Sequence, residues 1–372
     1  MVVDRDPSPE RADLEAICDR LAPQLARLAG KSVLITGGAG FLGYYLIRSL
    51  LAYNEISDSL PVRVTVYDNY RRGVPDWMSS LESSSALSLV EHDITGALPI
   101  GVPEFDFIIH AASIASPTFY RQHPIETMDA NVTGLRLLLD HCRERAAEGR
   151  SPEGFLFFSS SEIYGDPTAD QIPTPETYPG NVSPTGPRAC YDESKRYGET
   201  LCVNFHREYG LPVKIVRPFN NYGPGLSAND RRVLSDFARR VLADDDIEIL
   251  SDGSPTRTFC YVADAVVGYF KVLVDGRPGE AYNIGCDGPE ISIAELARRV
   301  QELAGELFGY QGEVVLRTRG DGDYLVDSPQ RRCPRIDKAR SELGFEPRIA
   351  LDDGLRRTLL WYRAQVAPAG RA

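Results

Sequence analysis

A glycine-rich segment between an apolar run and an apolar helix constrains the fold of this 372-residue chain more than any other feature. Residues 33–35 read Val-Leu-Ile, and Thr36-Gly37-Gly38-Ala39-Gly40-Phe41-Leu42-Gly43 follows directly. Gly37 permits a tight turn, Gly40 lets the backbone approach a pyrophosphate, and Gly43 lets the helix pack closely on the strand. The N-terminus of that helix would face the phosphates. The segment therefore predicts a dinucleotide site in a strand-turn-helix unit.

Short apolar runs alternate with helix-like segments up to residue 217. We expect strands at 33–35, 62–67, 87–91, 105–110, 155–159 and 213–217, and helices at 41–52, 124–145 and 190–209. Alternation of this kind is typical of a parallel, doubly wound sheet. Strands that are apolar throughout fit a sheet covered on both faces. The prediction is an α/β fold with a Rossmann-type doubly wound sheet.

The regions outside this alternation predict two further parts. A helix from Ser8 to Gly30, capped by Ser8, is expected to dock on the main body as an N-terminal extension. After residue 217 come a polar loop at 220–230 and shorter elements at 232–242, 247–250, 262–274, 291–308, 314–317 and 351–365. We predict a helical extension at 1–30, a cofactor-binding Rossmann domain at 31–217 and a smaller α/β substrate-binding region at 218–372, with the lobes interleaved.

Composition excludes several classes of partner and site. The net charge of -12 argues against a nucleic acid or an anionic membrane as partner. Seven cysteines, widely spaced and without a CxxC pair, argue against a metal site and against a disulfide framework. Free thiols are typical of a reducing cytoplasm. Because neither an apolar run of membrane-spanning length nor a signal peptide is present, we expect a cytoplasmic protein.

The ends of the next two strands predict the identity of the dinucleotide. Asp68 ends the second strand at the distance expected of a carboxylate that binds the adenosine ribose. It would accept hydrogen bonds from the 2'-hydroxyl and repel a 2'-phosphate, which favours NAD over NADP, although Arg71 and Arg72 weaken that preference. Asp93, after the third strand, could meet the adenine amino group or could equally be a turn residue.

Two further segments carry groups suited to oxidation of a hydroxyl. Tyr191 and Lys195 are four residues apart and share one face of a helix. We expect the Lys195 ammonium to lower the pKa of the Tyr191 phenol, so that the pair removes a proton while hydride leaves to NAD. At the end of the fifth strand, Ser160 is placed to hydrogen-bond the reacting oxygen. Burial would raise the pKa of Glu162 and suit it to proton transfer, unless Glu162 is only a cap or turn residue.

These segments resemble a known family. The chain is similar, over residues 31–362, to the extended short-chain dehydrogenase/reductases that modify nucleotide sugars, and most of all to UDP-glucuronate decarboxylases, which make UDP-xylose. The stretches that carry the resemblance are SSSEIYGDP at 159–167, GPRACYDESKR at 186–196, NDRRV at 229–233, GSPTRTFCYVAD at 253–264 and DSPQRRCP at 327–334.

The resemblance implies roles residue by residue. Ser160, Tyr191 and Lys195 match the oxidation triad, and Glu162 matches the decarboxylase glutamate. The expected ligands of the nucleotide sugar are Tyr120, Asn131, Asn220, Arg232, Arg257 and Arg332. Of these, Arg257 and Arg332 would pair with the diphosphate, a contact that guanidinium groups make in a bidentate way.

The resemblance also implies a reaction and an assembly. NAD would oxidise C4 of the glucuronate, and the 4-ketone would let the C6 carboxylate leave as CO2. A proton would be added at C5, and hydride would return to C4 to give UDP-xylose, or the 4-keto sugar would be released. A homodimer is expected, with the helices near 124–145 and 190–209 packed across the two-fold axis.

Some positions leave other functions open. Ser161 stands where sugar 4,6-dehydratases of the family have an Asp before the Glu, and Glu162 stands where 4-epimerases have a small residue. Gly225 replaces an arginine of the decarboxylases, and the loop at 112–117 lacks their second proline. The alternatives are an NAD-dependent epimerase or dehydratase that acts on another nucleotide diphosphate sugar, and a non-catalytic binding protein. Release of CO2 from the substrate separates the first alternative from a decarboxylase.

Overall fold

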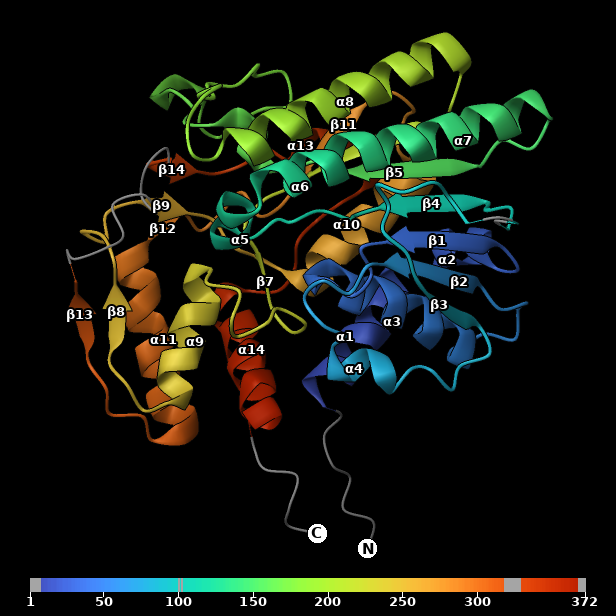
Figure 1. The fold of residues 1–372 in the computed structure, drawn as a ribbon. Coiled ribbons are helices and arrows are strands. Elements are labelled where there is room, and N and C mark those ends of the chain that lie inside the picture. Colours follow the sequence, from blue (N-terminus) through green and yellow to red (C-terminus); the bar gives the residue numbers. More distant parts are fainter. Residues whose placement is uncertain (1–7, 100, 102, 318–328, 367–372) are drawn as a thin grey trace, which may run out of the picture.

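A parallel sheet of seven strands runs through the centre of the computed structural model, which describes residues 8–99, 101, 103–317 and 329–366 (Figure 1). Its strands are β1 (Ser32–Thr36), β2 (Arg63–Asp68), β3 (Leu87–Glu91), β4 (Phe107–His110), β5 (Gly154–Phe158), β6 (Val213–Pro218) and β11 (Ala281–Ile284). Their order is β11-β6-β5-β4-β1-β2-β3, so the winding reverses between β1 and β4. The predicted doubly wound fold is confirmed, and the reversal is where such sheets bind ligands.

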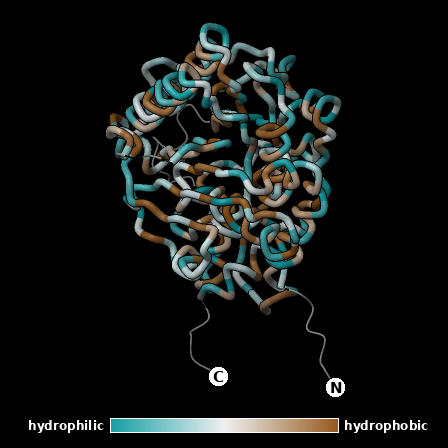
Figure 2. The backbone as a smooth tube through the Cα atoms, turned by 90° about the vertical axis from the view of Figure 1, so that its right-hand side faces the viewer, coloured by the Kyte–Doolittle hydropathy of each residue, from teal (hydrophilic) through white to brown (hydrophobic). Residues whose placement is uncertain are grey.

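Helices cover both faces of this sheet. Helices α3 (Phe41–Ile56) and α10 (Val262–Asp275) pack on one face, and α7 (Leu135–Ala147) and α8 (Ala189–Tyr209) pack on the other. Neighbouring residues of β1 enter different cores, since Val33 packs on the α3 side and Leu34 on the α7 side. Figure 2 shows the hydrophobic stretches running through the interior. The continuous apolar strands follow from this burial on both faces.

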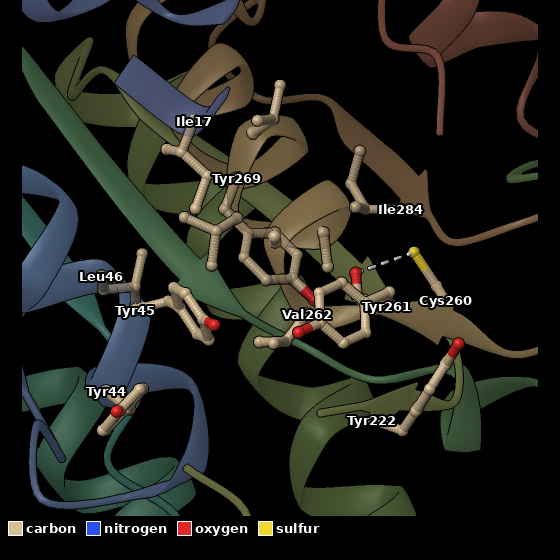
Figure 3. Close-up of a cluster of buried hydrophobic side chains, with 14 of the residues drawn as sticks. Ile17, Tyr44, Tyr45, Leu46, Tyr222, Cys260, Tyr261, Val262, Tyr269 and Ile284 are labelled. Carbon is tan, nitrogen blue, oxygen red and sulfur yellow. Dashed lines mark hydrogen bonds between the residues drawn. The ribbon is translucent and has the colours of Figure 1, made fainter. Parts of the chain in front are cut away.

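The N-terminal extension is two helices, where the sequence predicted one. Helix α1 (Pro9–Arg20) is followed by α2 (Ala22–Leu28). Pro23 has no N–H to donate and its ring crowds the preceding turn, which ends α1. The predicted cap is confirmed, because Ser8 Oγ accepts the Arg11 N–H at 3.4 Å. The predicted docking is also confirmed, and Figure 3 shows Ile17 of α1 beside Tyr269 in the core that contains Tyr45.

The helix predicted at 124–145 is interrupted. Helix α6 (Pro124–Asp129) leads into a π-turn, η1 (Ala130–Gly134), and then into α7. Turns of this kind are frequent at functional sites.

A smaller lobe forms from residues after β6. It contains α9 (Val233–Leu242), β8 (Ile247–Ile249), α11 (Ile293–Phe308), β13 (Val314–Leu316) and α14 (Leu351–Val366), together with a small sheet of β12 (Ile291–Ser292), β9 (Thr256–Arg257) and β14 (Arg331–Arg332). Most of these elements were predicted in outline, but β9, β14 and β11 were not, and β12 lies within the element predicted at 291–308. Because β11 pairs with β6, the chain returns to the central sheet after entering the smaller lobe. The domain limits at 30 and 217 stay a prediction.

Two findings concern the whole chain. Among the residues that the structure describes, no helix is both long and apolar enough to cross a membrane. All seven cysteines are free thiols, and six of them are buried.

Candidate active site

A cleft of about 1810 Å³ opens at the carboxyl ends of the central strands. A site for one small ligand is usually about 300–1,000 Å³, so this cleft has room for a cofactor and a second ligand. It lies between the sheet and loops of the smaller lobe. The predicted site residues on its wall are Gly37, Gly40, Phe41, Leu42, Gly43, Asp68, Asp93, Ser160, Glu162, Tyr191, Lys195, Asn220, Arg232, Arg257 and Arg332.

The glycine-rich turn after β1 fits a dinucleotide. Gly37 has a φ of +74°, and a Cβ there would lie 2.5 Å from Ala112 Cα. A Cβ on Gly43 would lie 2.0 Å from the Gly38 oxygen. Helix α3 begins at Phe41 without a side-chain cap, so its first N–H groups face the cleft. Side chains are thus excluded where a pyrophosphate would approach the helix N-terminus.

The carboxylate at the end of β2 is held in place by backbone groups. Asp68 Oδ2 accepts the Ala39 N–H and Oδ1 accepts the Tyr70 N–H, each at 2.9 Å. Burial raises the pKa of Asp68, and these two hydrogen bonds oppose the rise. Each oxygen keeps a second lone pair for a ribose hydroxyl, which fits the carboxylate predicted for NAD.

Asp93 forms a turn and also lines the cleft. Its Oδ1 accepts the Thr95 N–H at 3.0 Å, and its Oδ2 accepts a hydrogen bond from Asn69 at 3.0 Å. Of the two alternatives that the sequence left open, the turn is present. The contact with adenine stays a prediction.

The Tyr191–Lys195 pair lies on α8 with its side chains in the cleft wall. Lys195 Nζ lies 5.8 Å from the centre of the Tyr191 ring and donates to the Phe158 carbonyl at 2.7 Å. Burial lowers the pKa of Lys195 to about 7. Burial raises the pKa of Tyr191 to about 12, and a hydrogen bond with Ser160 opposes the rise. The expected lowered pKa of Tyr191 is wrong for this arrangement, because desolvation of the phenol is the largest influence on it.

Glu162 lies between two arginines. It follows β5 in the short helix η2 (Ser161–Tyr164), and its carboxylate binds Arg188 from the start of α8 and Arg332 from β14. Arg332 Nη2 donates to Oε2 at 2.6 Å. Burial alone would raise the pKa of Glu162, but the charges of Arg188 and Arg332 outweigh it and hold the pKa well below its usual range. The expected raised pKa is therefore wrong, and Glu162 is an ionised carboxylate.

Arg188 was not among the residues predicted from the sequence, although it lies in the stretch at 186–196 that carries the family resemblance. Arg188 lies three residues before Tyr191, one helical turn away on the same side of α8. It is buried, and its charge is shared between Glu162 and, at 3.9 Å, Asp192. Burial and the charge of Glu162 raise the pKa of Asp192. The spacing to the tyrosine was the signal that could have identified Arg188.

Two predicted ligands lie behind the wall of the cleft. Tyr120 stacks on Tyr191, with ring centres 5.1 Å apart, and Asn131 in the π-turn donates to Ser194 Oγ at 2.8 Å. Both side chains are buried and neither lines the cleft. The structure places them as supports of α8, and it does not bring them together with the other predicted ligands.

The remaining predicted ligands lie on the smaller lobe's side of the cleft. Asn220 donates to the Thr258 carbonyl at 2.8 Å, and Arg232 forms an ion pair with Asp230 at 2.9 Å. Arg257 donates to the carbonyls of Thr256 at 2.7 Å and Pro329 at 2.6 Å, which ties β9 to the chain before β14. Residues 327 and 328 of the DSPQRRCP stretch lie outside the described residues.

Comparison with known proteins gave one family and many relatives. Residues 33–285 match the model of the NAD dependent epimerase/dehydratase family. UDP-glucuronic acid decarboxylase 5 of Arabidopsis thaliana is 38% identical over 87% of this chain and 86% of that protein.

Solved structures are similar over nearly the whole length. The epimerase Mth375 of Methanothermobacter thermautotrophicus superposes with a TM-score of 0.78 at 27% identity, covering 94% of this chain and 96% of that one. The Bordetella bronchiseptica enzyme WbmF, solved with NAD+ and UDP, superposes with a TM-score of 0.72 at 26% identity, covering 92% and 95%.

Proposed function

The chain belongs to the NAD dependent epimerase/dehydratase family, and on this premise we propose that it decarboxylates UDP-glucuronate through a 4-keto intermediate to UDP-xylose or its 4-keto precursor. The observation that carries the proposal is Glu162, an ionised carboxylate held at the cleft by Arg188 and Arg332. The name of the Arabidopsis relative supports the same substrate.

The cofactor site would be formed by the glycine-rich turn, the N-terminus of α3 and Asp68. When bound there, NAD would supply hydride-transfer chemistry at C4. The structure of WbmF with NAD+ and UDP supports this pair of ligands for a cleft of the same fold.

At C4, the chain's own groups would move one proton. Tyr191 takes the proton of the C4 hydroxyl, and Ser160, which is hydrogen-bonded to Tyr191, holds the same oxygen. Lys195 keeps the end of β5 against α8 through its bond to Phe158. Because burial disfavours the phenolate, Tyr191 would act as this base only after its phenol has lost its own proton, and the positive charge of bound NAD+ would favour that loss.

At C6, the two arginines would bind the carboxylate. Arg188 and Arg332 carry two positive charges against the single charge of Glu162, so the cluster attracts an anion. Glu162 is ionised and has no proton to donate. Ser161 offers no carboxylic acid beside it, which disfavours loss of a hydroxyl as water and favours loss of CO2.

A homodimer would form through α6 and α8. Their outer surfaces expose the apolar residues Ile125, Met128, Tyr197 and Tyr209. Exposed apolar groups gathered on adjacent helices are typical of association surfaces. The free cysteines support a reducing compartment such as the cytoplasm.

One observation favours the second candidate, an epimerase or dehydratase for another nucleotide diphosphate sugar. Gly225, where the decarboxylases have an arginine, has a φ of +91°, and a Cβ there would lie 2.6 Å from Tyr44 Cβ. The cleft thus lacks one cation that the resembled enzymes have, and a different sugar could occupy that space.

Incubation with UDP-glucuronate, with and without added NAD, tests the proposal. Mass spectrometry and proton NMR should detect loss of the carboxyl group and formation of UDP-xylose or its 4-keto precursor. Tyr191→Phe should abolish this product, and Tyr197→Phe, exposed on the same helix, should not. Unchanged UDP-glucuronate with a protein that binds NAD would refute decarboxylation and direct attention to other nucleotide sugars.

A further inference from the structure

One carboxylate joins the two sides of the cleft. Asp230, in the loop before α9, forms ion pairs with Arg72 at 3.2 Å and with Arg232 at 2.9 Å. Arg72 belongs to the loop after β2, four residues beyond Asp68, whereas Arg232 begins α9 in the smaller lobe. All three residues line the cleft. The cofactor side and the sugar side therefore share this contact.

The same point is anchored to a third segment. Ser116, just before α5 (Pro117–Gln122), donates to the backbone carbonyl of Asp230 at 2.7 Å. The Arg72 guanidinium lies 4.6 Å from the centre of the Phe119 ring in α5. Segments that follow β2, β4 and β7 (Asn221–Tyr222) thus converge on one residue at the mouth of the cleft.

The three side chains of this contact are buried to different degrees. The Asp230 side chain is only 3% exposed, while those of Arg72 and Arg232 are 48% and 32% exposed. A buried carboxylate between two guanidiniums is stable while both pairs exist and is costly to leave uncompensated. Next to it, Arg231 adopts a φ of +69°, a backbone strain that persists only where surrounding contacts fix the loop. The loop at 230–232 is therefore held against Arg72.

We propose that Asp230 is a positioning residue that latches the smaller lobe to the cofactor loop and retains the reduced cofactor until the keto sugar has been processed. The proposal rests on the proposed function, in which hydride is removed and later returned. If the latch opened early, NADH and the 4-keto sugar would both escape. With the latch closed, separation of the cofactor loop from the smaller lobe requires the ion pair between Asp230 and Arg72 to break.

The rate of NADH dissociation tests the latch without any sugar. Enzyme loaded with NADH is mixed with excess NAD, and the loss of bound-NADH fluorescence is followed by stopped flow. Asp230→Asn and Arg72→Gln should each raise the rate about tenfold or more, since truncating a partner of a buried charge pair acts mainly on dissociation. Arg72→Lys, which keeps the charge, should raise it less.

Asp275→Asn is the matched control, because the Asp275 carboxylate also binds two side chains, Gln24 at 2.6 Å and Arg27 at 2.9 Å, but lies outside the cleft. It should leave the NADH rate unchanged. With UDP-glucuronate, Asp230→Asn should release more 4-keto sugar together with NADH.

A folded Asp230→Asn variant that holds NADH as long as the wild type does would overturn the latch. If that variant does not fold, Arg72→Gln, whose side chain is half exposed, decides in the same way. If the wild type does not convert UDP-glucuronate, the proposed function fails, and the NADH rates still decide whether the latch exists.

Discussion

Glu162 and its two partners, Arg188 and Arg332, come from three separate parts of the chain, and the two arginines keep Glu162 ionised. We expect Glu162→Gln to slow release of CO2 about a hundredfold, because Arg188 and Arg332 would lose the carboxylate that positions them, and a small misplacement of substrate-orienting groups can cost that much. Oxidation at C4, followed by the absorbance of NADH, should persist. Glu193→Gln, a half-buried glutamate near Tyr191 on α8, is the control and should behave as the wild type. Equal loss of both steps would mean that Glu162 only supports the fold.

Lys195 gives a prediction for stability against pH. Burial lowers its pKa in the folded state to about 7, from 10.5 in the unfolded chain. Between these values the unfolded chain binds more protons, so this residue makes stability rise with pH. The free energy of unfolding of the wild type minus that of Lys195→Met should increase from about pH 7 to about pH 9, by at most about 1.4 kcal/mol per pH unit.

Urea unfolding of both proteins across this range measures the difference. A difference that is independent of pH would show that Lys195 carries the same charge in both states.

The role of a single residue could be predicted where its interactions are local in the sequence. Gly37, Asp68, Tyr191 and Lys195 belong to short motifs, and the structure places all four on one cleft. The charge state of Glu162 could not be predicted, because Arg332 lies 170 positions away and only the fold brings it near. Apolar neighbours in the sequence indicate that Glu162 is buried, and burial raises the pKa of a carboxyl group. They do not indicate the arginines, whose charges lower that pKa.

The N-terminal helix α1 is attached through a buried carboxylate. Asp13 is fully buried and accepts hydrogen bonds from Tyr45 of α3 at 2.7 Å and Tyr261 at 2.6 Å, and it pairs with Arg357 of α14. Asp13→Ala should lower the free energy of unfolding by about 3 kcal/mol, since it leaves a half-buried arginine and two buried hydroxyls without their partner. Asp19→Ala, exposed on the same helix, should change it by less than about 0.5 kcal/mol in urea denaturation.

The loop at Gly225 gives a second prediction at this scale. Gly225→Arg should destabilise the protein by about 2–4 kcal/mol, because strain from the positive φ adds to the clash with Tyr44. Gly149→Arg is the control: its φ is +77° but nothing lies near a Cβ, so only the strain remains. Thermal unfolding of both variants separates the two costs. Equal shifts in melting temperature would show that the loop yields to a side chain.

Elements were predicted well where their own residues decide them. The break between α1 and α2 could have been read from Pro23. Strand β11 could not be predicted, because its four residues, Ala-Tyr-Asn-Ile, are too few to show a pattern of apolar and polar positions. Its state is decided by pairing with β6, which is a long-range event.

For the whole molecule, the outer faces of α6 and α8 predict a dimer. Ile125 and Tyr197 are 60% and 50% exposed. Ile125→Glu with Tyr197→Glu should shift the protein from dimer to monomer in light scattering, because buried like charges oppose the contact. Leu60→Glu places the same charge at a more exposed apolar residue elsewhere and should leave the mass unchanged. A wild type that is monomeric at every concentration would refute the interface.

Strand β11 has a consequence for how such a protein can diversify. Its residues lie far along the chain, after α10, yet they complete the central sheet beside β6 (Figure 1). The smaller lobe therefore cannot be exchanged between homologues as a separate unit without cutting the central sheet. New specificity has to arise by point changes in loops such as those containing Gly225 and Asp230, while the two halves are inherited as one unit.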